Sequence, residues 1–247
     1  MCEGHQHSFD CYQQRRNFLK LAGSATALGI FGSGLLSGVA RADSLTRAQR
    51  DKMSPAEIIA VMKKGNERFR GGVRKNRNYL NEQKASASGQ YPAAALLSCI
   101  DSRAPAEVIM DLGIGDIFNC RVAGNVANED ILGSMEFACK LAGAKVVLVM
   151  GHTACGAIKG AIDNADLGNL TGLLDKIRPA LQATSYSGER ASKNYNFVDA
   201  VARTNVLITM DNIRKNSAVL AELESKGNIK IAGAMYNLQT AVLDFLS

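Results

Sequence analysis

The stretch KVVLVMGHTAC, residues 145–155, joins a predicted strand to two side chains that can bind a metal. Residues 145–150 are an apolar, valine-rich run between two glycines, which is typical of a strand buried in the core. His152 and Cys155 follow with the spacing His-x-x-Cys. Imidazole and thiolate are two of the ligand types that hold zinc in proteins. The stretch therefore predicts a central strand with candidate metal ligands just beyond its carboxyl end.

A second motif, CIDSR at residues 99–103, lies upstream and has the same organisation. Residues 93–100 form a short apolar run, so we expect a strand that ends near the cysteine. In an open α/β sheet, ligands collect outside the carboxyl ends of the strands, where the two motifs would meet. Thiolate, imidazole and carboxylate are all zinc ligands. The two motifs together predict a metal site made of Cys99, Asp101, His152 and Cys155.

The rest of the chain alternates predicted strands with predicted helices. Residues 74–90 are polar and are expected to form a loop. Strands that alternate with helices imply an α/β fold with a mainly parallel central sheet flanked by helices. Further strands are expected at residues 116–122 and 228–236; helices are expected at 54–70, 105–112 and 129–141, along most of 156–226 with a break near 184–192, and at 241–246.

The amino-terminal segment has the pattern of an export signal. Residues 14–20, QRRNFLK, match a twin-arginine motif; residues 21–40 carry no charge; and residues 40–42, ARA, have the small-x-small pattern of a cleavage site. An uncharged run of this length could instead be a retained membrane anchor, but its glycines make it weakly hydrophobic. We expect residues 1–42 to be a cleaved signal peptide and residues 43–247 to form one periplasmic domain without a stable membrane anchor.

Histidine and cysteine usage narrows the choice of ligands. Of the three histidines, His5 and His7 lie in the predicted signal, so His152 would be the only one in the mature chain. An even number of cysteines in an exported protein normally suggests disulfides. We instead interpret two of them as metal ligands and the other two, which lie in apolar stretches, as buried free thiols. The ligands would be Cys99 and Cys155, and the free thiols Cys120 and Cys139.

The charge pattern does not favour a nucleic-acid-binding protein. The formal net charge is +6, and charged residues make up 21% of the chain, which is ordinary for a globular protein. Arg74, Lys75 and Arg77 form the densest basic run, and no stripe of interleaved aromatic residues accompanies them. We interpret this run as a solvated surface and expect no nucleic-acid partner.

Taken together, the motifs resemble those of the β-class carbonic anhydrases over nearly the whole predicted mature chain. The strongest similarity lies in C-x-D-S-R and in G-H-x-x-C-G, at residues 99–103 and 151–156. The resemblance implies an enzyme that interconverts CO2 and bicarbonate with one zinc ion per subunit. It also implies a homodimer or homotetramer in which the helix starting at Ser54 packs on the partner subunit. Weaker matches are RVAGN at 121–125, SMEFA at 134–138, GAIK at 156–159 and Gln90-x-Pro92.

The resemblance also assigns roles to the metal-site residues. Zinc would be held by Cys99, His152 and Cys155, and its fourth position would alternate between Asp101 and a water or hydroxide. Arg103 would draw Asp101 away from the metal, because a guanidinium fork pairs well with a carboxylate. With its only mature-chain histidine bound to zinc, the protein would have to release protons through other groups or through buffer.

Three further residues are implied as substrate-binding groups. Gly156 would offer its backbone N–H from the start of a helix. Gln90 would supply another donor, either within the subunit or across a subunit boundary. Phe118 would contribute to the apolar wall that a nonpolar gas needs.

Two other functions use similar residues. Hydrolysis of carbonyl sulfide or carbon disulfide could occur on the same zinc constellation, and a comparison of rates on the two substrate classes would separate them. A noncatalytic zinc- or anion-binding protein is the alternative from another class, although the paired Asp101 and Arg103 argue against it. A thiol-redox protein fits poorly, because the sequence has no Cys-x-x-Cys.

Overall fold

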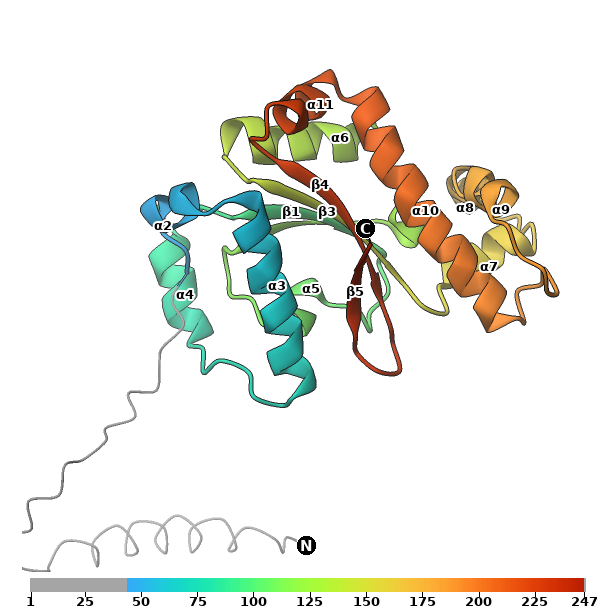
Figure 1. Cartoon of the computed structure of the whole chain (residues 1–247), viewed down its shortest axis with the longest axis horizontal. Helices are drawn as coiled ribbons and strands as arrows, with labels where there is room; N and C mark the ends of the chain where they lie inside the picture. The colour runs from blue at the N-terminus through green and yellow to red at the C-terminus, as the bar shows by residue number, and fades with distance from the viewer. Residues whose placement is uncertain (1–43, 247) are drawn as a thin grey trace, which may run out of the picture. The chain divides into compact units, whose positions relative to one another are not determined.

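The computed structural model describes residues 44–246, so the predicted signal peptide, residues 1–42, lies outside the described residues. The described part contains a five-stranded sheet with the order β2-β1-β3-β4-β5 (Figure 1). The first four strands are parallel, and β5 runs antiparallel to β4. This confirms the predicted α/β fold. The strands are β1 (Ala94–Ser98), β2 (Ile117–Arg121), β3 (Val146–His152), β4 (Lys230–Tyr236) and β5 (Leu243–Leu246).

The two central strands explain the apolar runs in the sequence. Every residue of β1 and of β3 is buried, because helices cover both faces of the sheet at this point. The edge strand β2 is only partly buried. β1 and β3 are direct neighbours with Ser98 opposite Met150, so their carboxyl ends lie side by side.

Helices cover the two faces of the sheet unequally. Figure 1 shows α3 and α5 on one side of the sheet and α6, α10 and α11 on the other. The long helix α10 packs on β3 and β4, whereas α3 contacts α5 and β3. The helical segments are α2 (Arg47–Lys52), α3 (Pro55–Arg70), α4 (Tyr79–Ser86), α5 (Ala106–Ile109), the 3-10 turn η1 (Ala123–Asn125), α6 (Glu129–Glu136), the π-helical η2 (Phe137–Leu141), α7 (Gly156–Ile162), α8 (Gly168–Asp175), α9 (Arg178–Ala183), α10 (Tyr195–Asn216) and α11 (Ala218–Ser225).

The start of α3 follows from its capping residues. The Ser54 side chain accepts the N–H of Glu57 at 3.3 Å, and the Glu57 carboxylate accepts the N–H of Ser54 at 2.8 Å. Further along, a Cβ on Gly65 would lie 1.8 Å from the Met110 carbonyl oxygen, so only glycine allows α3 to approach this closely. α3 therefore packs on its own chain, and its predicted contact with a partner subunit stays a prediction.

The predicted secondary structure was wrong for two segments. Residues 74–90, expected to be a loop, contain α4, whose N-terminus is capped by Asn78 accepting the N–H of Asn81 at 3.0 Å. Its buried residue is Glu82, so the helix lacks the apolar stripe on which the expectation relied. Residues 241–246, expected to be a helix, contain β5 instead. A short apolar run is ambiguous in sequence, and here pairing with the free edge of β4 decides the outcome.

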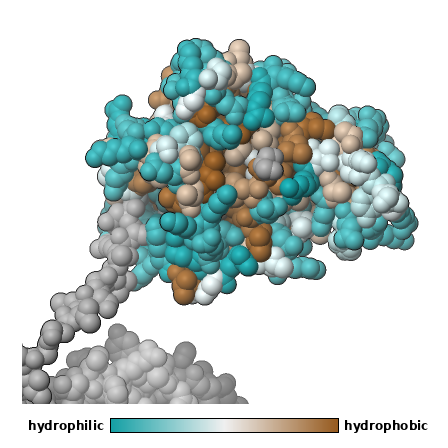
Figure 2. All heavy atoms as spheres, in the orientation of Figure 1, coloured by the Kyte–Doolittle hydropathy of each residue, from teal (hydrophilic) through white to brown (hydrophobic). Residues whose placement is uncertain are grey.

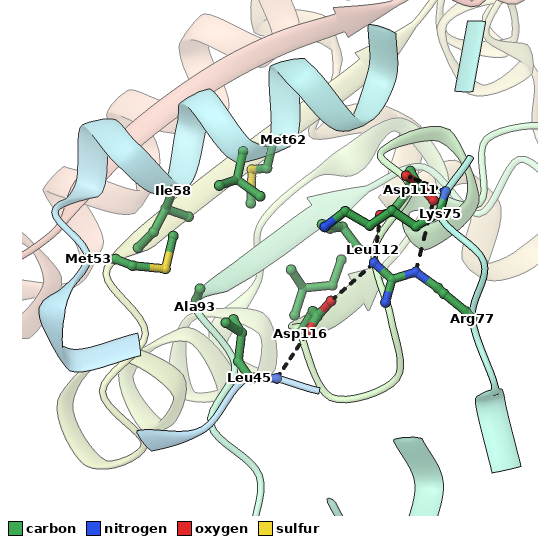
Figure 3. A pocket seen from close by; sticks show the side chains of 12 residues that line it. Leu45, Met53, Ile58, Met62, Lys75, Arg77, Ala93, Asp111, Leu112 and Asp116 are labelled. Atoms are coloured by element: carbon green, nitrogen blue, oxygen red, sulfur yellow. Dashed lines mark hydrogen bonds and ion pairs between the residues drawn. The ribbon is translucent and has the colours of Figure 1, made fainter. Parts of the chain in front are cut away.

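A cavity of about 310 Å³ lies between α3 and the edge of the sheet. Figure 3 shows its apolar wall, which includes Ile58 and Met62 of α3, and its polar end, where Arg77 reaches Asp111 and Asp116. Arg77 Nη2 donates to the Asp111 carbonyl oxygen at 2.9 Å and lies 3.9 Å from Asp116 Oδ2. The charges at this end of the cavity therefore neutralise one another.

The surface combines a hydrophilic rim with exposed apolar residues. In the view of Figure 2, hydrophobic residues gather towards the middle of the face, with hydrophilic residues around them. Across residues 44–246, none of the helices combines the length and the apolarity that crossing a membrane requires. Large apolar side chains with half or more of their surface exposed are Val73, Leu80, Ile100, Phe137, Leu141, Leu167 and Tyr195.

Candidate metal centre

Three predicted ligands meet at the carboxyl ends of β1 and β3. Cys99 directly follows β1, His152 is the last residue of β3, and Cys155 is the N-cap residue of α7. Their ligand atoms all lie within 4.8 Å of one another, and all three residues are buried. The parallel register of the neighbouring strands therefore brings together residues that are far apart in the sequence.

The donor geometry fits a tetrahedral zinc ion. The two sulfur atoms are 4.0 Å apart, whereas two sulfurs bound to one tetrahedral zinc at about 2.3 Å each would be about 3.8 Å apart. His152 Nδ1 lies 2.9 Å from the Thr153 carbonyl oxygen, which leaves Nε2 to face the sulfurs. Nε2 is buried and has no hydrogen-bond partner. A buried polar atom without a partner is costly, and a metal ion at this position would supply one.

The two thiols are electrostatically coupled. The hydrogen bond with Cys155 lowers the pKa of Cys99, with smaller contributions from His152 and from the Gly124 N–H, which donates to Cys99 Sγ at 3.4 Å. The same sulfur–sulfur contact, together with burial, raises the pKa of Cys155. Without a cation, one thiolate makes it harder to ionise the other thiol. A divalent cation bound to both sulfurs would stabilise two thiolates at once.

Asp101 lies beside this group and is paired with Arg103. The guanidinium donates to both carboxylate oxygens, from Nε at 2.9 Å and from Nη2 at 2.7 Å, and the Arg103 backbone N–H adds a bond of 2.9 Å. This pairing lowers the pKa of Asp101 to about 2, against the opposing effect of partial burial. Asp101 Oδ2 is 3.8 Å from His152 Nε2. An ionised carboxylate is therefore held at the margin of the three ligands.

Contacts from other elements fix the loop after β1 and the turn η1 after β2. Arg121 of β2 donates from Nε to the Cys99 carbonyl oxygen at 3.0 Å and also bonds the Asp101 carbonyl oxygen. Asn205 of α10 donates to the Gly124 carbonyl oxygen at 2.7 Å. Gly124 has φ +68°, and a Cβ there would lie 2.6 Å from the Ile177 side chain, so glycine is needed for this turn.

The predicted substrate-binding residues lie at different places. Gly156 is the first residue of α7, next to Cys155, and nothing lies within 4 Å of the position that a Cβ would take. Gln90 is exposed and lines a separate cavity with residues of the α4 region and Gly115. Phe118 packs edge-on against Phe137 at a centroid distance of 6.2 Å and lines a cavity with α6. Within this one chain, neither Gln90 nor Phe118 is grouped with the metal ligands, and their substrate contacts stay predictions.

Two residues on α10 belong to the surroundings of the site and were missed in the sequence. Asp199 Oδ1 accepts the N–H of Ala154 at 2.7 Å, and Asn205 supports Gly124 as described above. Both residues are distant in sequence from the two ligand motifs and have no distinctive spacing relative to them. Only the packing of α10 against β3 reveals their place.

Comparison with known proteins points to a single family. Residues 94–243, more than half of the chain, match the family model described as carbonic anhydrase. The chain is 30% identical over 191 residues to carbonic anhydrase 2 of Mycobacterium tuberculosis, covering 75% of this chain and 89% of that protein. It is also 30% identical over 187 residues to the carbonic anhydrase of Mycolicibacterium smegmatis, covering 75% of this chain and 90% of that protein.

Solved structures agree with the sequence relatives. The β-carbonic anhydrase CafA of Aspergillus fumigatus superposes with a TM-score of 0.60 at 25% identity, covering 78% of this chain and 90% of that chain. A tetrameric β-carbonic anhydrase from Sordaria macrospora gives a TM-score of 0.57 at 22% identity, covering 65% of this chain and 83% of that chain. At 22% identity, the similarity to the Sordaria macrospora protein shows a shared fold only.

Proposed function

This chain belongs to the β-class carbonic anhydrase family, and we propose that it hydrates CO2 reversibly to bicarbonate and a proton at one zinc ion per subunit. The observation that carries the proposal is the buried group of Cys99, His152 and Cys155, with ligand atoms within 4.8 Å of one another. Two thiolates and one imidazole are a ligand set that favours zinc. At such a site zinc supplies a nucleophile by lowering the pKa of water, to about 7 in well-studied cases.

The protein's own residues would prepare this chemistry. Arg103 holds Asp101 ionised and oriented, so the carboxylate can accept a hydrogen bond from the attacking water. The contact of His152 Nδ1 with the Thr153 carbonyl fixes the plane of the imidazole. Two thiolates donate more charge than neutral imidazoles, so we expect the working pH to lie higher than for a site with three histidines.

Proton release must rely on groups other than histidine. His152 is the only histidine after residue 42, and its Nε2 faces the proposed metal position. The hydration reaction produces one proton per turnover, so buffer must accept it from solvent-accessible groups near Asp101. We expect turnover at saturating CO2 to increase with buffer concentration.

The first test compares the wild-type chain with Asp101→Ala, both loaded with zinc. Stopped-flow measurement should show fast CO2 hydration by the wild type and a large loss in the variant, because the variant cannot orient the water. Asp130→Ala, which removes a carboxylate from α6 outside the ligand group, is the matched control and should hydrate CO2 normally. Zinc bound in full with no hydration between neutral and alkaline pH would contradict the proposal.

The proposed assembly is a homodimer or homotetramer. The Sordaria macrospora relative is described as tetrameric, and on the face shown in Figure 2 hydrophobic residues gather in the middle, as on a surface that a partner covers. A second subunit would also offer a way to bring Gln90 or Phe118 to an active site. Sedimentation velocity at micromolar concentration checks this: a monomer only would contradict it.

The proposed location is the periplasm, after twin-arginine export and cleavage before Asp43. The support is the sequence pattern of residues 14–42 described above. Amino-terminal sequencing of the exported protein should begin at Asp43, and export should stop when Arg15 and Arg16 are both replaced by lysine.

The relatives named above are carbonic anhydrases, so hydrolysis of carbonyl sulfide or carbon disulfide is left without support.

A further inference from the structure

Two of the proposed zinc ligands sit on one short turn, residues 152–155, between β3 and α7. We propose that Asp199 is a positioning residue for zinc: it holds Ala154 in a left-handed conformation and thereby sets the spacing of His152 and Cys155. This inference rests on the zinc site proposed above. It concerns how tightly the ion is held, a property that can be measured without an activity assay.

The turn contains a residue in an unfavourable backbone conformation. Ala154 has φ +55°, a region that L-residues other than glycine rarely adopt because the Cβ crowds the backbone. Relaxation of Ala154 to a negative φ would redirect the chain between His152 and Cys155. Because both ligands must reach one ion, such a change would separate the imidazole from the thiolate. Something in the surrounding structure must therefore stabilise this conformation.

Asp199 makes the contact that can do this. Its Oδ1 accepts the Ala154 N–H at 2.7 Å, a short bond of the kind made by an ionised acceptor. Burial raises the pKa of Asp199, and the Ala154 N–H acts in the opposite direction. The carboxylate thus supports one of the two residues between His152 and Cys155, the one that directly precedes Cys155.

The rest of the turn is anchored elsewhere, which isolates the role of Asp199. The Thr153 N–H donates to the Tyr236 carbonyl oxygen at 3.0 Å, and Thr153 Oγ1 accepts the Leu238 N–H at 3.0 Å. Those bonds tie Thr153 to β4 and to the loop after it. Ala154 is instead tied to α10, on the other side of the turn, through Asp199.

Helix α10 is a rigid support for this contact. Phe197, Val198 and Val201, which flank Asp199 on the helix, are fully buried in the core on this face of the sheet. Asp199 also borders a polar cavity of about 570 Å³ that is lined by Arg103, Thr153 and Ala154 among others. Because the packed helix holds the Asp199 side chain at the border of this cavity, Asp199 can fix the turn without filling the cavity.

The experiment measures zinc release from the full chain to a chromogenic chelator in excess. Asp199→Ala should release zinc about 10–100-fold faster than the wild type, the usual effect of losing a residue that orients a metal ligand. Asp199→Asn keeps an acceptor oxygen and should stay within about threefold of the wild type. Asp211→Ala removes an exposed carboxylate from the same helix and should have no effect.

A second substitution tests the backbone explanation directly. Glycine adopts positive φ without the Cβ penalty, so Ala154→Gly in the Asp199→Ala background should slow zinc release by about fivefold. In the Ala154→Gly background, Asp199→Ala and Asp199→Asn should release zinc at more similar rates than in the Ala154 background. If Asp199→Ala alone does not fold, as judged by circular dichroism, the release rates of Asp199→Ala and Asp199→Asn in the Ala154→Gly background can still be compared with each other.

The possible results separate this inference from the function on which it rests. Wild-type release rates in folded Asp199→Ala would overturn the positioning role and leave the zinc site intact. Equal acceleration in Asp199→Asn and Asp199→Ala would also overturn it, because charge and not the hydrogen bond would then matter. A wild-type chain that binds no zinc would contradict both the inference and the proposed function.

Discussion

Within residues 44–246, the buried groups of ionisable side chains around Asp111 and around Cys99 are built in opposite ways. Around Asp111, which is fully buried, the chain provides its own counter-charges: Arg68 Nε lies 2.6 Å from Asp111 Oδ2, and Arg74 and Arg77 lie within 4 Å of Asp111 Oδ1. Figure 3 shows Arg77 beside Asp111. Burial alone would raise the pKa of Asp111, but the Arg68 contact holds it below its usual value. The arginines thus compensate the charge of Asp111, although Arg68 Nη2, Arg77 Nε and Asp111 Oδ1 make no hydrogen bond.

The cysteine–histidine group is built differently. Its sulfurs lie 4.0 Å apart, and the His152 Nε2 atom is buried without a partner. The neighbouring cation, Arg103, is already paired with Asp101 through two hydrogen bonds. A buried polar cluster whose charges are balanced stabilises a fold, whereas one that lacks a cation is suited to bind one.

The largest expected effect is the loss of a ligand from the cysteine–histidine group. Cys155→Ala should reduce bound zinc well below one ion per chain and bring CO2 hydration down to the uncatalysed rate, because two ligands hold zinc poorly. Metal analysis and stopped-flow assays on the same sample check both effects. Cys139→Ala, which removes a buried thiol outside the ligand group, is the control. Normal activity in Cys155→Ala would show that the cluster is not the catalytic centre.

The second expected effect is on stability and comes from the balanced cluster. Asp111→Asn keeps the side-chain shape and tolerates the positive φ of +48°, but leaves the arginines uncompensated. The free energy of unfolding should fall by about 3 kcal/mol or more, as expected when one partner of a buried ion pair is removed. Urea denaturation measures it, and the folded fraction should still bind zinc.

The matched control for this prediction is Asp244→Asn. Asp244 pairs with Arg203 at 3.2 Å on the surface, where both side chains are at least half exposed. Exposed pairs contribute about 0–1 kcal/mol, so the control should unfold nearly like the wild type. If Asp111→Asn lowered the free energy of unfolding as little as Asp244→Asn does, the Asp111 cluster would not stabilise the fold.

The smallest expected effect is a change in the protonation of Asp101. Its pKa is about 2 in the folded protein, below the ordinary 3.8. The stabilising contribution of its pairing is therefore fully present above about pH 4 and is lost as the pH falls through 2. Between pH 5 and 9, Asp101 should stay ionised and produce no step in the pH–rate profile.

Arg103→Gln tests this assignment. Loss of the guanidinium should raise the pKa of Asp101 towards 3.8, which carbon-13 NMR of labelled aspartate can follow in a pH titration. Arg103→Lys keeps a positive charge without the two-pronged geometry and should give an intermediate pKa. An unchanged midpoint in Arg103→Gln would mean that another group keeps Asp101 ionised.

The sequence predicts those parts of the protein whose signal is local. β1 and β3 are buried on both faces, so their apolar runs are continuous, and the ligands follow where each strand ends. The short run at 241–246 carries no comparable signal, because the free edge of β4 decides that it forms a strand. The sequence does not predict α4, because its buried residue is the charged Glu82 and the helix has no apolar stripe. Glu82 pairs with Arg77 at 3.0 Å.

The surroundings of the site depend on contacts that a single sequence does not encode locally. Asp199 reaches the turn after β3, and Asn205 reaches Gly124 of η1, only because α10 packs against β3. Gln90 and Phe118 lie apart from the ligands within one chain, so their predicted contact with substrate depends on an assembly of subunits. The ligands themselves could be predicted because their chemical types and their positions after strands coincide.

We propose that the Cys99, His152 and Cys155 group binds the catalytic zinc. The most direct test strips the protein of metal and restores zinc stepwise while CO2 hydration is followed by stopped flow. We expect the rate to rise in proportion to added zinc and to level off at one ion per chain, with no rise in Cys155→Ala. A chain that takes up one zinc ion at these residues and gains no hydration activity would contradict it.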